Sequence, residues 1–450
     1  AVGRLALTNN TTGNENTAVG NGALSTNIDG DRSVAVGYNA LATQEPASNV
    51  DMYNVAMGHS AGALLTTGVE NIFIGGLAGD STTTGSTNAF VGHNSGGLNT
   101  TGQNNTALGA YSLDAMTTGS DNVAMGKSAL GALTTGNRNT VLGLNAGDAL
   151  TDADDNVAVG TASLSTDTLG SRSVAIGKEA LAAQNFTSAT NAYNVAVGAF
   201  AGNAVSTGIQ NTFVGGLAGD ANTTGGANVA IGYHALGAED TGNRNVAVGH
   251  EALVAQNSNA ANNNVAVGYQ AGHDITTGVH NTFVGGEAGD GNDDGNNNVA
   301  VGYLALSGNC GDSNVAIGLE ALKVTTGAAN TCIGKSSGDA VTSGSNNLFA
   351  GNDSGRTGSP GGNMTNDANK IVLGDDNIGE AHIQVDWTVA SDQRDKTDFT
   401  ALDLGLNFVK ALAPVTYKWD KRSKYGDKTA DGYDLNAQSP DGTHKEDWLD

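Results

Sequence analysis

The 450-residue chain has little of what usually builds a compact core or a covalent framework: 2 cysteines, 4 prolines and 5% aromatic residues. Two thiols in a chain of this length do not make a disulfide scaffold. Scarce proline, together with glycines that do not recur at every third residue, excludes a collagen triple helix. No apolar run approaches the roughly 20 residues that cross a bilayer. We therefore expect neither a disulfide-stapled domain nor a membrane-inserted one.

Basic residues are also scarce, with 20 Lys and Arg against 45 Asp and Glu and a net charge of −25. Binding to a phosphate backbone requires Lys and Arg, so nucleic acid is not an expected partner, and an anionic membrane surface is equally unsuitable. Only 14% of the residues are charged, which excludes a charge-rich disordered chain. Glycine is abundant instead, at 66 residues, roughly double its ordinary usage.

A sequence repeat explains this composition. Its unit is Asn-Val-Ala-Val-Gly-x-x-Ala followed by Leu or Gly, and Thr-Thr-Gly often comes next. Successive central glycines stand at positions i and i+17 in fifteen of the 20 intervals, and at i+16, i+19 or i+21 in the others. The 21 central glycines are residues 3, 20, 37, 58, 75, 92, 109, 126, 143, 160, 177, 198, 215, 232, 249, 268, 285, 302, 318, 334 and 351.

The Val-Ala-Val segment predicts a short strand whose first and third residues point to one side and whose second residue points to the other. The third residue is bulky in nearly every copy, and we predict that this row is a buried core stripe. The second residue is usually Ala and sometimes Phe, and we predict that it faces a tighter contact. Cys332 stands in this second position as a small apolar filler. Examples of the third residue are Val36, Met57, Ile74, Leu108, Ile176 and Val284.

Three polar or glycine positions complete the unit. We expect the central glycine to adopt a conformation closed to residues with a Cβ, or to let another backbone approach closely. The glycine of Thr-Thr-Gly is predicted to take a positive φ in a return turn. Asn precedes the strand in 18 of 20 copies, with Ser33 and Ser173 in the other two, and stacked Asn side chains can hydrogen-bond along a ladder.

One such unit cannot bury its own apolar face, and stacking solves this because each strand pairs with the equivalent strand of the next coil. We therefore predict an all-β fold for residues 1–355, a β-solenoid or β-roll of about 21 coils. At ~4.8 Å per coil this gives a rod of roughly 100 Å. Small second-position residues such as Ala56 and Ala230 suit lateral packing, and we predict an elongated homotrimer.

The repeat resembles a known family at Ser-Val-Ala-Val-Gly (residues 33–37) and Ser-Val-Ala-Ile-Gly (residues 173–177). These segments are similar to the head repeats of trimeric autotransporter adhesins of the YadA type, which are trimeric β-rolls. The resemblance extends over most of residues 1–355 and implies a trimeric, adhesive rod. The repeat period of this chain is longer than the coil of that family.

The longer intervals place extra residues at 42–53, 182–193 and 254–263. Because these insertions occupy the same part of the coil, we expect them to leave the same corner of the rod. Loops on a rigid scaffold are where binding specificity usually resides. Receptor contact is therefore one interpretation of these loops, and neutral insertion is the other.

The pattern decays after the last repeat. Residues 356–390 are predicted to be a linker with capping strands at 370–374 and 383–387. From residue 391 onward the composition changes, and apolar residues at helical spacing over 402–412 precede a strand-like segment at 415–419. We predict a separate small α+β module over residues 391–450.

This module resembles a second family. Ser-Asp-Gln-Arg-Asp-Lys (391–396), Gly-Leu (405–406) and Leu-Ala-Pro-Val-Thr-Tyr-Lys-Trp (412–419) are similar to the start of peptidase S74, the intramolecular chaperone of endosialidase at the C-terminus of phage tail fibres and tailspikes. That family domain continues through a further segment, so we expect an incomplete chaperone here. The resemblance implies trimerisation followed by self-cleavage.

The same resemblance implies a Ser–Lys dyad, with Ser391 as the nucleophile and Lys396 as the base, and cleavage next to Ser391. A serine hydroxyl is a weak nucleophile that needs a neighbouring base, and a lysine can serve only if desolvation lowers its pKa. Trimer closure would supply that burial. The alternative is that Ser391 caps a helix and Lys396 is solvated.

These features favour a structural and adhesive homotrimeric fibre of a phage tail, outside the cell, that contacts a host cell-surface receptor (a glycan or an outer-membrane component) and other tail or surface proteins. One alternative is a bacterial surface adhesin or extracellular filament. Another is a polysaccharide-degrading tailspike, which needs two carboxylates about 5–10 Å apart that the sequence does not identify. We expect no cofactor, no metal site and no turnover enzyme, with self-cleavage as the only reaction; weak Ca²⁺ binding at the acidic turns 152–155 and 290–295 stays open.

Overall fold

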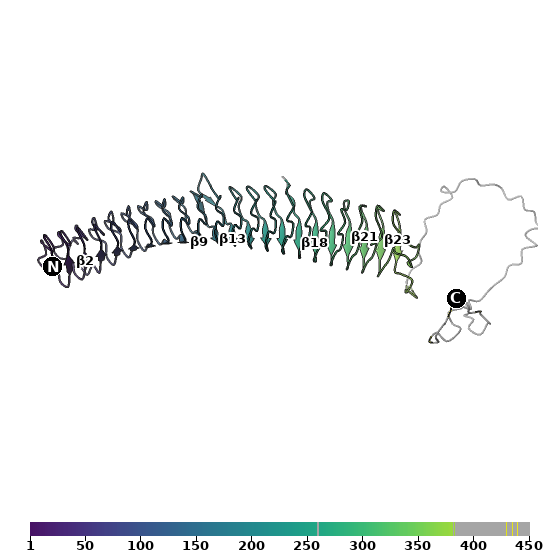
Figure 1. The fold of residues 1–450 in the computed structure, drawn as a ribbon, viewed down its shortest axis with the longest axis horizontal. Helices are drawn as coiled ribbons and strands as arrows, with labels where there is room; N and C mark the ends of the chain where they lie inside the picture. Colours follow the sequence, from purple (N-terminus) through teal and green to yellow (C-terminus); the bar gives the residue numbers. More distant parts are fainter. Residues whose placement is uncertain (259–260, 381, 383–428, 430–433, 435–438, 440–450) are drawn as a thin grey trace, which may run out of the picture. The chain divides into compact units, whose positions relative to one another are not determined.

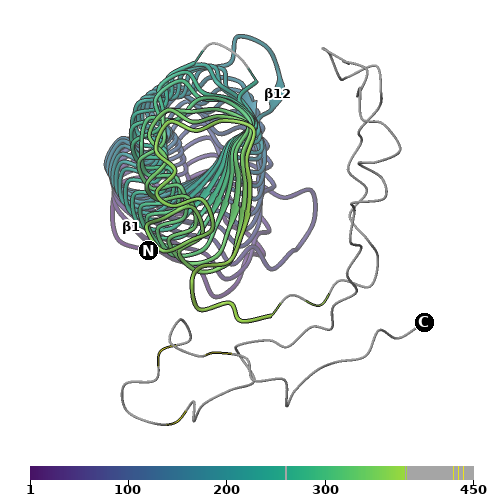
Figure 2. The same cartoon turned by 90° about the vertical axis from the view of Figure 1, so that its right-hand side faces the viewer.

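The computed structural model describes residues 1–258, 261–380, 382, 429, 434 and 439. Residues Ala1–Glu380 form one compact unit and Ala381–Asp450 a second. The first unit is a long stack of similar coils, as Figure 1 shows from the side and Figure 2 along the stack. Equivalent residues of most neighbouring coils are 17 positions apart in the chain, as Asn54 and Asn71 are. This confirms the predicted β-solenoid and its period.

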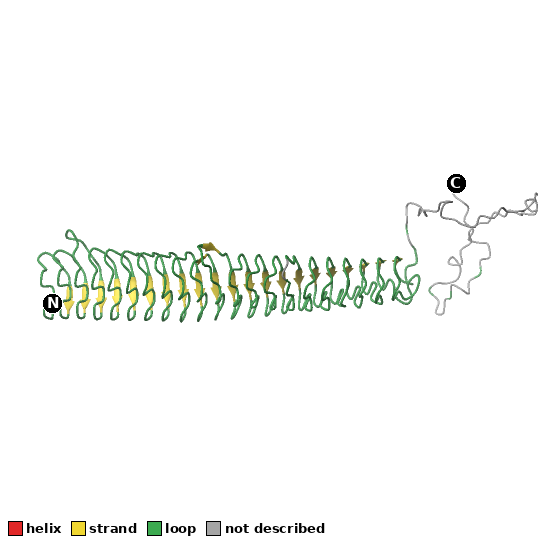
Figure 3. Ribbon diagram, turned by 90° about the horizontal axis from the view of Figure 1, so that it is seen from above, coloured by secondary structure: helices red, strands yellow, loops and turns green. Residues whose placement is uncertain are grey.

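Each coil contributes one three-residue strand to a single parallel sheet, which holds 21 of the strands found among the described residues. Equivalent residues of successive coils are paired, for example Val229 with Val246 and Ala230 with Ala247. Figure 3 shows these strands in one row along one side of the stack, with no helix among the described residues. The strands are β1 (Thr17–Val19), β2 (Val34–Val36), β3 (Val55–Met57), β4 (Ile72–Ile74), β5 (Ala89–Val91), β6 (Thr106–Leu108), β7 (Val123–Met125), β8 (Thr140–Leu142), β9 (Val157–Val159), β10 (Gly170–Ser171), β11 (Val174–Ile176), β12 (Thr190–Asn191), β13 (Val195–Val197), β14 (Thr212–Val214), β15 (Val229–Ile231), β16 (Val246–Val248), β17 (Val265–Val267), β18 (Thr282–Val284), β19 (Val299–Val301), β20 (Val315–Ile317), β21 (Thr331–Ile333), β22 (Leu348–Ala350) and β23 (Ile371–Leu373).

The central glycine meets both requirements expected of it. Its φ lies between 118° and 150° in every copy, a region that residues with a Cβ rarely adopt. A Cβ on Gly75 would lie 2.3 Å from the carbonyl oxygen of Gly92 in the next coil. The glycine therefore permits both the turn after the strand and the close approach of the next backbone.

The asparagine column also forms as predicted. Asn71 donates its backbone N–H and its Nδ2 to Oδ1 of Asn54, at 2.9 and 3.2 Å, and its Nδ2 also donates to the carbonyl of Gly85 at 2.9 Å. These side chains are fully buried. Because a buried amide without partners costs about 1–3 kcal/mol, the ladder ties each coil to its neighbours and fixes their register.

The Thr-Thr-Gly turn differs from the prediction. Its glycines, such as Gly85 and Gly102, do not have positive φ. The left-handed residue is the one before the asparagine, such as Glu70 or Thr87, with φ of 59° and 58°. Glycine is required for another reason: a Cβ on Gly85 would lie 2.5 Å from the carbonyl oxygen of Gly102.

The prediction of which strand residues form the core is wrong. The second residue of the strand points into the coil and is fully buried, as in Ala56, Phe73 and Ala230. The third residue points outward, and Met57 and Leu108 are 49% and 46% exposed. The interior of the coil also holds the alanine and the leucine or glycine that follow the central glycine, so the second strand residue is small wherever that leucine is present. Cys332, in the second row, is buried as the predicted filler.

Two kinds of coil in this stack differ in how the interior is filled, and others, such as the coil of Ala56 with Gly62, combine a small residue with Gly. Where the second strand residue is Phe, the fourth residue after the central glycine is Gly; a Cβ on Gly79 would lie 2.5 Å from the ring of Phe73. In coils where that fourth residue is Leu, as at Leu236, the second strand residue is Ala, as at Ala230. The Phe–Gly coils contain Phe73, Phe90, Phe213, Phe283 and Phe349 with Gly79, Gly96, Gly219, Gly289 and Gly355.

Candidate functional site

The outer sheet face is a continuous surface along the 21-stranded sheet of the solenoid. We define it as the first and third side chains of the strands in the 21-stranded sheet. Its members are aliphatic or Thr, and no charged residue occurs in either row. The large members that are at least 36% exposed are Val19, Met57, Ile72, Ile74, Leu108, Leu142, Ile176, Ile231, Val267, Val284, Val301, Ile317, Ile333, Leu348, Ile371 and Leu373.

A broken row of aromatic side chains begins directly after the central glycines, beyond the ends of the strands. Tyr233 stacks on His250 with ring centroids 5.4 Å apart, and His250 stacks on Tyr269 at 5.5 Å. Tyr38 and His59 form the same pair near the other end of the stack, at 5.2 Å. The tyrosines of this row are about half exposed. We call this feature the aromatic row.

The corner loops are residues 42–53, 182–193 and 254–263, of which 259–260 lie outside the described residues. Each loop pairs with the preceding coil at the same point of the repeat, through Asp31↔Asp51, β10↔β12 and Asn243↔Ala261. The expectation that they leave one corner is therefore confirmed, and Figure 2 shows the loop with β12 projecting beyond the outline of the coils.

Each corner loop is anchored by a buried glutamine inside its coil. Nε2 of Gln44 donates to Oγ of Ser33 at 3.0 Å, and its Oε1 accepts from Nδ2 of Asn54 at 3.0 Å. Gln184 repeats this arrangement, and its Nε2 also donates to the buried carboxylate of Asp167 at 2.6 Å. Gln256 occupies the same position in the third long coil. These loops are thus supported by specific interior contacts.

Arginine–tyrosine pairs lie at the base of two corner loops. Arg32 donates to the hydroxyl of Tyr53 at 3.1 Å and forms ion pairs with Glu15 and Asp51. Arg172 donates to the hydroxyl of Tyr193 at 2.8 Å. In both cases the guanidinium lies over the tyrosine ring, 5.6 and 5.7 Å from its centroid. The pairs stiffen the loop bases and present mixed polar and aromatic chemistry at the surface.

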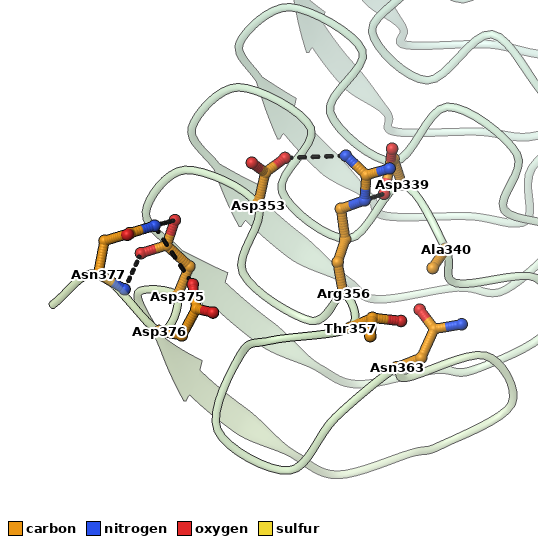
Figure 4. Close-up of a pocket in the computed structure, with 9 residues that line it drawn as sticks. All are labelled: Asp339, Ala340, Asp353, Arg356, Thr357, Asn363, Asp375, Asp376 and Asn377. Atoms are coloured by element: carbon orange, nitrogen blue, oxygen red, sulfur yellow. Dashed lines mark hydrogen bonds and ion pairs between the residues drawn. The ribbon is translucent and has the colours of Figure 1, made fainter. Parts of the chain in front are cut away.

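A polar hollow of about 440 Å³ lies at the C-terminal end of the solenoid. Figure 4 shows Arg356 at its wall, where it forms ion pairs with Asp353 at 2.9 Å and Asp339 at 3.0 Å. Asn377 donates its backbone N–H and Nδ2 to the carboxylate of Asp375 at 3.0 and 3.1 Å. These contacts close the terminal turns, and the hollow brings together no nucleophile–base pair.

Chemistry-bearing groups elsewhere in the solenoid are few. Cys310 and Cys332 are free and buried, and burial raises the pKa of each thiol to about 12, so neither is a reactive thiolate. Within the described part of the chain, no three His, Cys, Asp or Glu side chains come together as metal ligands. No helix among the described residues has the length and apolarity to cross a membrane.

The predicted dyad, Ser391 and Lys396, lies outside the described residues, as do the segments predicted as strands at 383–387 and 415–419 and as a helix at 402–412. The predicted strand at 370–374 is confirmed as β23 (Ile371–Leu373), which pairs with β22.

Comparison with known protein families gives a match in the C-terminal segment. The family model of peptidase S74, described as the chaperone of endosialidase, matches residues 391–435. Its first residue coincides with the predicted nucleophile. No curated protein matches the chain.

Proposed function

We propose that the chain is the shaft of a homotrimeric phage tail fibre that contributes to host attachment, with an endosialidase-type chaperone at its C-terminus. The observation that carries this proposal is the family match at residues 391–435, which follows the β-solenoid in the chain. A β-solenoid followed by such a chaperone fits a structural protein of the tail-fibre or tailspike kind. The chaperone also implies trimeric assembly.

Location distinguishes this proposal from its main alternative, a bacterial surface adhesin or filament built from YadA-like repeats. Gold-labelled antibody against the solenoid is expected to bind the tail of a phage particle. Labelling of the surface of uninfected cells would instead support the adhesin. A polysaccharide-degrading tailspike is less favoured, because the described hollow at the C-terminal end ties its carboxylates to Arg356 and Asn377.

The chaperone is proposed to release itself after assembly, with Ser391 as nucleophile and Lys396 as base. A lysine exposed to water stays protonated and cannot accept the serine proton, so cleavage should require the burial that trimerisation provides. Ser391→Ala and Lys396→Ala are expected to give an uncut but trimeric product, and mass spectrometry of the full-length product checks this.

Thr397→Ala is the matched control, because it removes a neighbouring hydroxyl from the same segment. Cleavage should survive in this variant. A wild-type trimer that remains intact, or a Ser391→Ala variant that is still cut, would leave Ser391 and Lys396 without the proposed roles. Equal cleavage in single chains would refute the coupling to assembly.

Host attachment is proposed to use the corner loops. They leave one side of a regular scaffold and are held from inside by Gln44, Gln184 and Gln256. Shortening each long coil to the regular length of its neighbours should leave the rod folded and reduce particle adsorption at least tenfold. Adsorption assays on the host check this, and unchanged adsorption would place the receptor site elsewhere.

A further inference from the structure

The outer sheet face is an apolar surface that one chain leaves in water. Its rows of Val, Ile, Leu, Met and Thr run without a charged residue along the whole sheet, in a chain with 45 acidic and 20 basic residues and a net charge of −25. Exposed apolar patches beyond a few hundred Å² mark contact surfaces in soluble proteins. This face extends along the whole solenoid, so it requires a partner of comparable length.

The face stays continuous where the repeat itself does not. The interval between central glycines is longer than usual after Gly37, yet Val34 still pairs with Val55 and Val36 with Met57. The interval before Gly318 is one position shorter than usual, yet Val299 still pairs with Val315 and Val301 with Ile317. These length changes are thus placed away from the sheet, which keeps two unbroken rows of aliphatic and Thr side chains.

We infer that the outer sheet face is the surface through which copies of this chain associate. The inference rests on the proposed homotrimer and assigns its contact to this face. A second copy is the occupant whose rows have the same coil spacing, so that each coil meets its equivalent. Copies that share one trimeric chaperone at residues 391–435 run in the same direction, and equivalent coils are equally far from it in the chain. The copies are therefore parallel and in register.

Size and charge agree with this assignment. A stable interface buries about 800 Å² on each partner, and two side chains per coil over the whole sheet exceed this requirement. The excess negative charge lies outside the face, so like-charge repulsion between copies is weakest at the face. The aromatic row follows the face as its edge, and half-exposed tyrosines are common in protein interfaces. The prediction that small residues such as Ala56 and Ala230 make the lateral contact is wrong, because this interior row is fully buried within one chain.

Cysteine crosslinking tests the contact on the full chain. Thr140 lies on the outer sheet face and Thr118 on the Thr-Thr-Gly turn, and both are exposed. With a short bismaleimide, Thr140→Cys should form a covalent two-chain species, since each chain offers one reactive thiol, whereas Thr118→Cys and wild type should not. The native thiols do not interfere, because both are buried.

A charge test uses two pairs of leucines with equal spacing. Leu108 and Leu142 lie on the outer sheet face at 46% and 45% exposure, while Leu64 and Leu98 lie off it at 52% and 55%. The pair Leu108→Lys and Leu142→Lys should lower the crosslinking of Thr140→Cys at least fivefold. The pair Leu64→Lys and Leu98→Lys should leave it unchanged.

The outcomes separate this inference from the proposed function. A wild-type chain with the mass of a single copy, 44.9 kDa by light scattering, would overturn both. A wild-type trimer in which Thr140→Cys does not crosslink would overturn the interface alone. Crosslinking of Thr118→Cys in place of Thr140→Cys would move the contact to the turn and also overturn it.

Discussion

Coils with Phe in the second strand position and coils with Ala there fill the same narrow interior in different ways. In the coil of Phe213 the fourth residue after the central glycine is Gly219, and in the next coil Ala230 is combined with Leu236. The outward strand residues do not differ in this way between the two coils. They are Thr212 and Val214 in the first and Val229 and Ile231 in the second, all uncharged.

This comparison teaches which side of the strand is the core. The interior row takes a Phe only in coils where the fourth residue after the central glycine is Gly, as close packing requires. The outward rows show no such compensation within the chain. Their apolar character therefore needs a different explanation, and we propose that it is contact between copies.

The largest effect is expected at the central glycine, which both kinds of coil share. Gly215 and Gly232 have φ of 139° and 135°, and a Cβ on either would lie 2.4 or 2.3 Å from a carbonyl oxygen of the next coil. Replacement of either residue by Ala should lower the free energy of unfolding by about 3 kcal/mol or more, because backbone strain and a backbone clash add. Urea unfolding followed by circular dichroism measures this.

Gly216→Ala is the control for both variants, because the nearest atom to its added Cβ is 3.7 Å away, in the ring of Tyr233. It should change stability by less than about 0.5 kcal/mol. A central-glycine variant as stable as Gly216→Ala would show that the coils do not approach as closely as described.

A smaller effect is expected when an Ala coil receives a phenylalanine. Ala230→Phe should destabilise the protein by about 1–3 kcal/mol, because Leu236 already occupies the space. Adding Leu236→Gly should restore most of this loss. The double variant would place a Phe–Gly coil next to the coil of Phe213, as the Phe73 and Phe90 coils are neighbours with Gly79 and Gly96. Urea midpoints of the two single variants and the double variant form a double-mutant cycle.

If the stability losses of Ala230→Phe and Leu236→Gly simply add in the double variant, Phe and Gly do not compensate each other in the interior of the coil. Leu236→Gly alone is the necessary comparison, and it should be destabilising by about 2–5 kcal/mol because it leaves a cavity beside Ala230. Recovery therefore requires that two harmful changes compensate each other.

Sequence reasoning could predict the coil, its period, the asparagine ladder and the central glycine, because each of these is repeated in identical form. It assigned the wrong side of the strand to the core because alternation defines two sides and hydrophobicity favoured the larger residues, such as Met57 and Leu108. The signal that distinguishes the sides is the coupling of Phe213 with Gly219 and of Ala230 with Leu236. That coupling is readable in the sequence.

Other features had no local signal. Glycine in Thr-Thr-Gly suggested a positive φ, yet the requirement at Gly85 is the approach of the Gly102 carbonyl from the next coil. Such a contact depends on stacking and not on the turn residues themselves. The proposed dyad, Ser391 and Lys396, remains a prediction that rests on residue pattern and on the family match.

The smallest effect concerns a half-buried carboxylate in a Phe coil. Burial, with the nearby charges of Glu287 and Asp274, raises the pKa of Asp290 to about 6. The ionised form is therefore penalised above that pH, and the penalty disappears as the pH falls toward the ordinary value of 3.8. Asp290→Asn should stabilise the protein at pH 8 by less than about 1 kcal/mol, since solvent screens the site, and should have no effect near pH 3.

Asp220, at the same position of another Phe coil, is the matched site. Burial raises the pKa of its carboxyl as well, but the like charges of Glu287 and Asp274 that raise the pKa of Asp290 further do not act on it. Asp220→Asn should therefore give a smaller gain than Asp290→Asn at pH 8. Thermal unfolding of both variants across this pH range would show it, and an equal gain at pH 3 and pH 8 would exclude titration as the cause.

The most direct test of the account is the cross-section of the assembled fibre, obtained by electron cryo-microscopy at a resolution that separates the coils. We predict three coil outlines related by threefold symmetry, with the strands of the sheet nearest the axis and the corner loops on the outside. A single coil outline, or three outlines with the strands on the periphery, would contradict the assignment of the outer sheet face as the contact between copies.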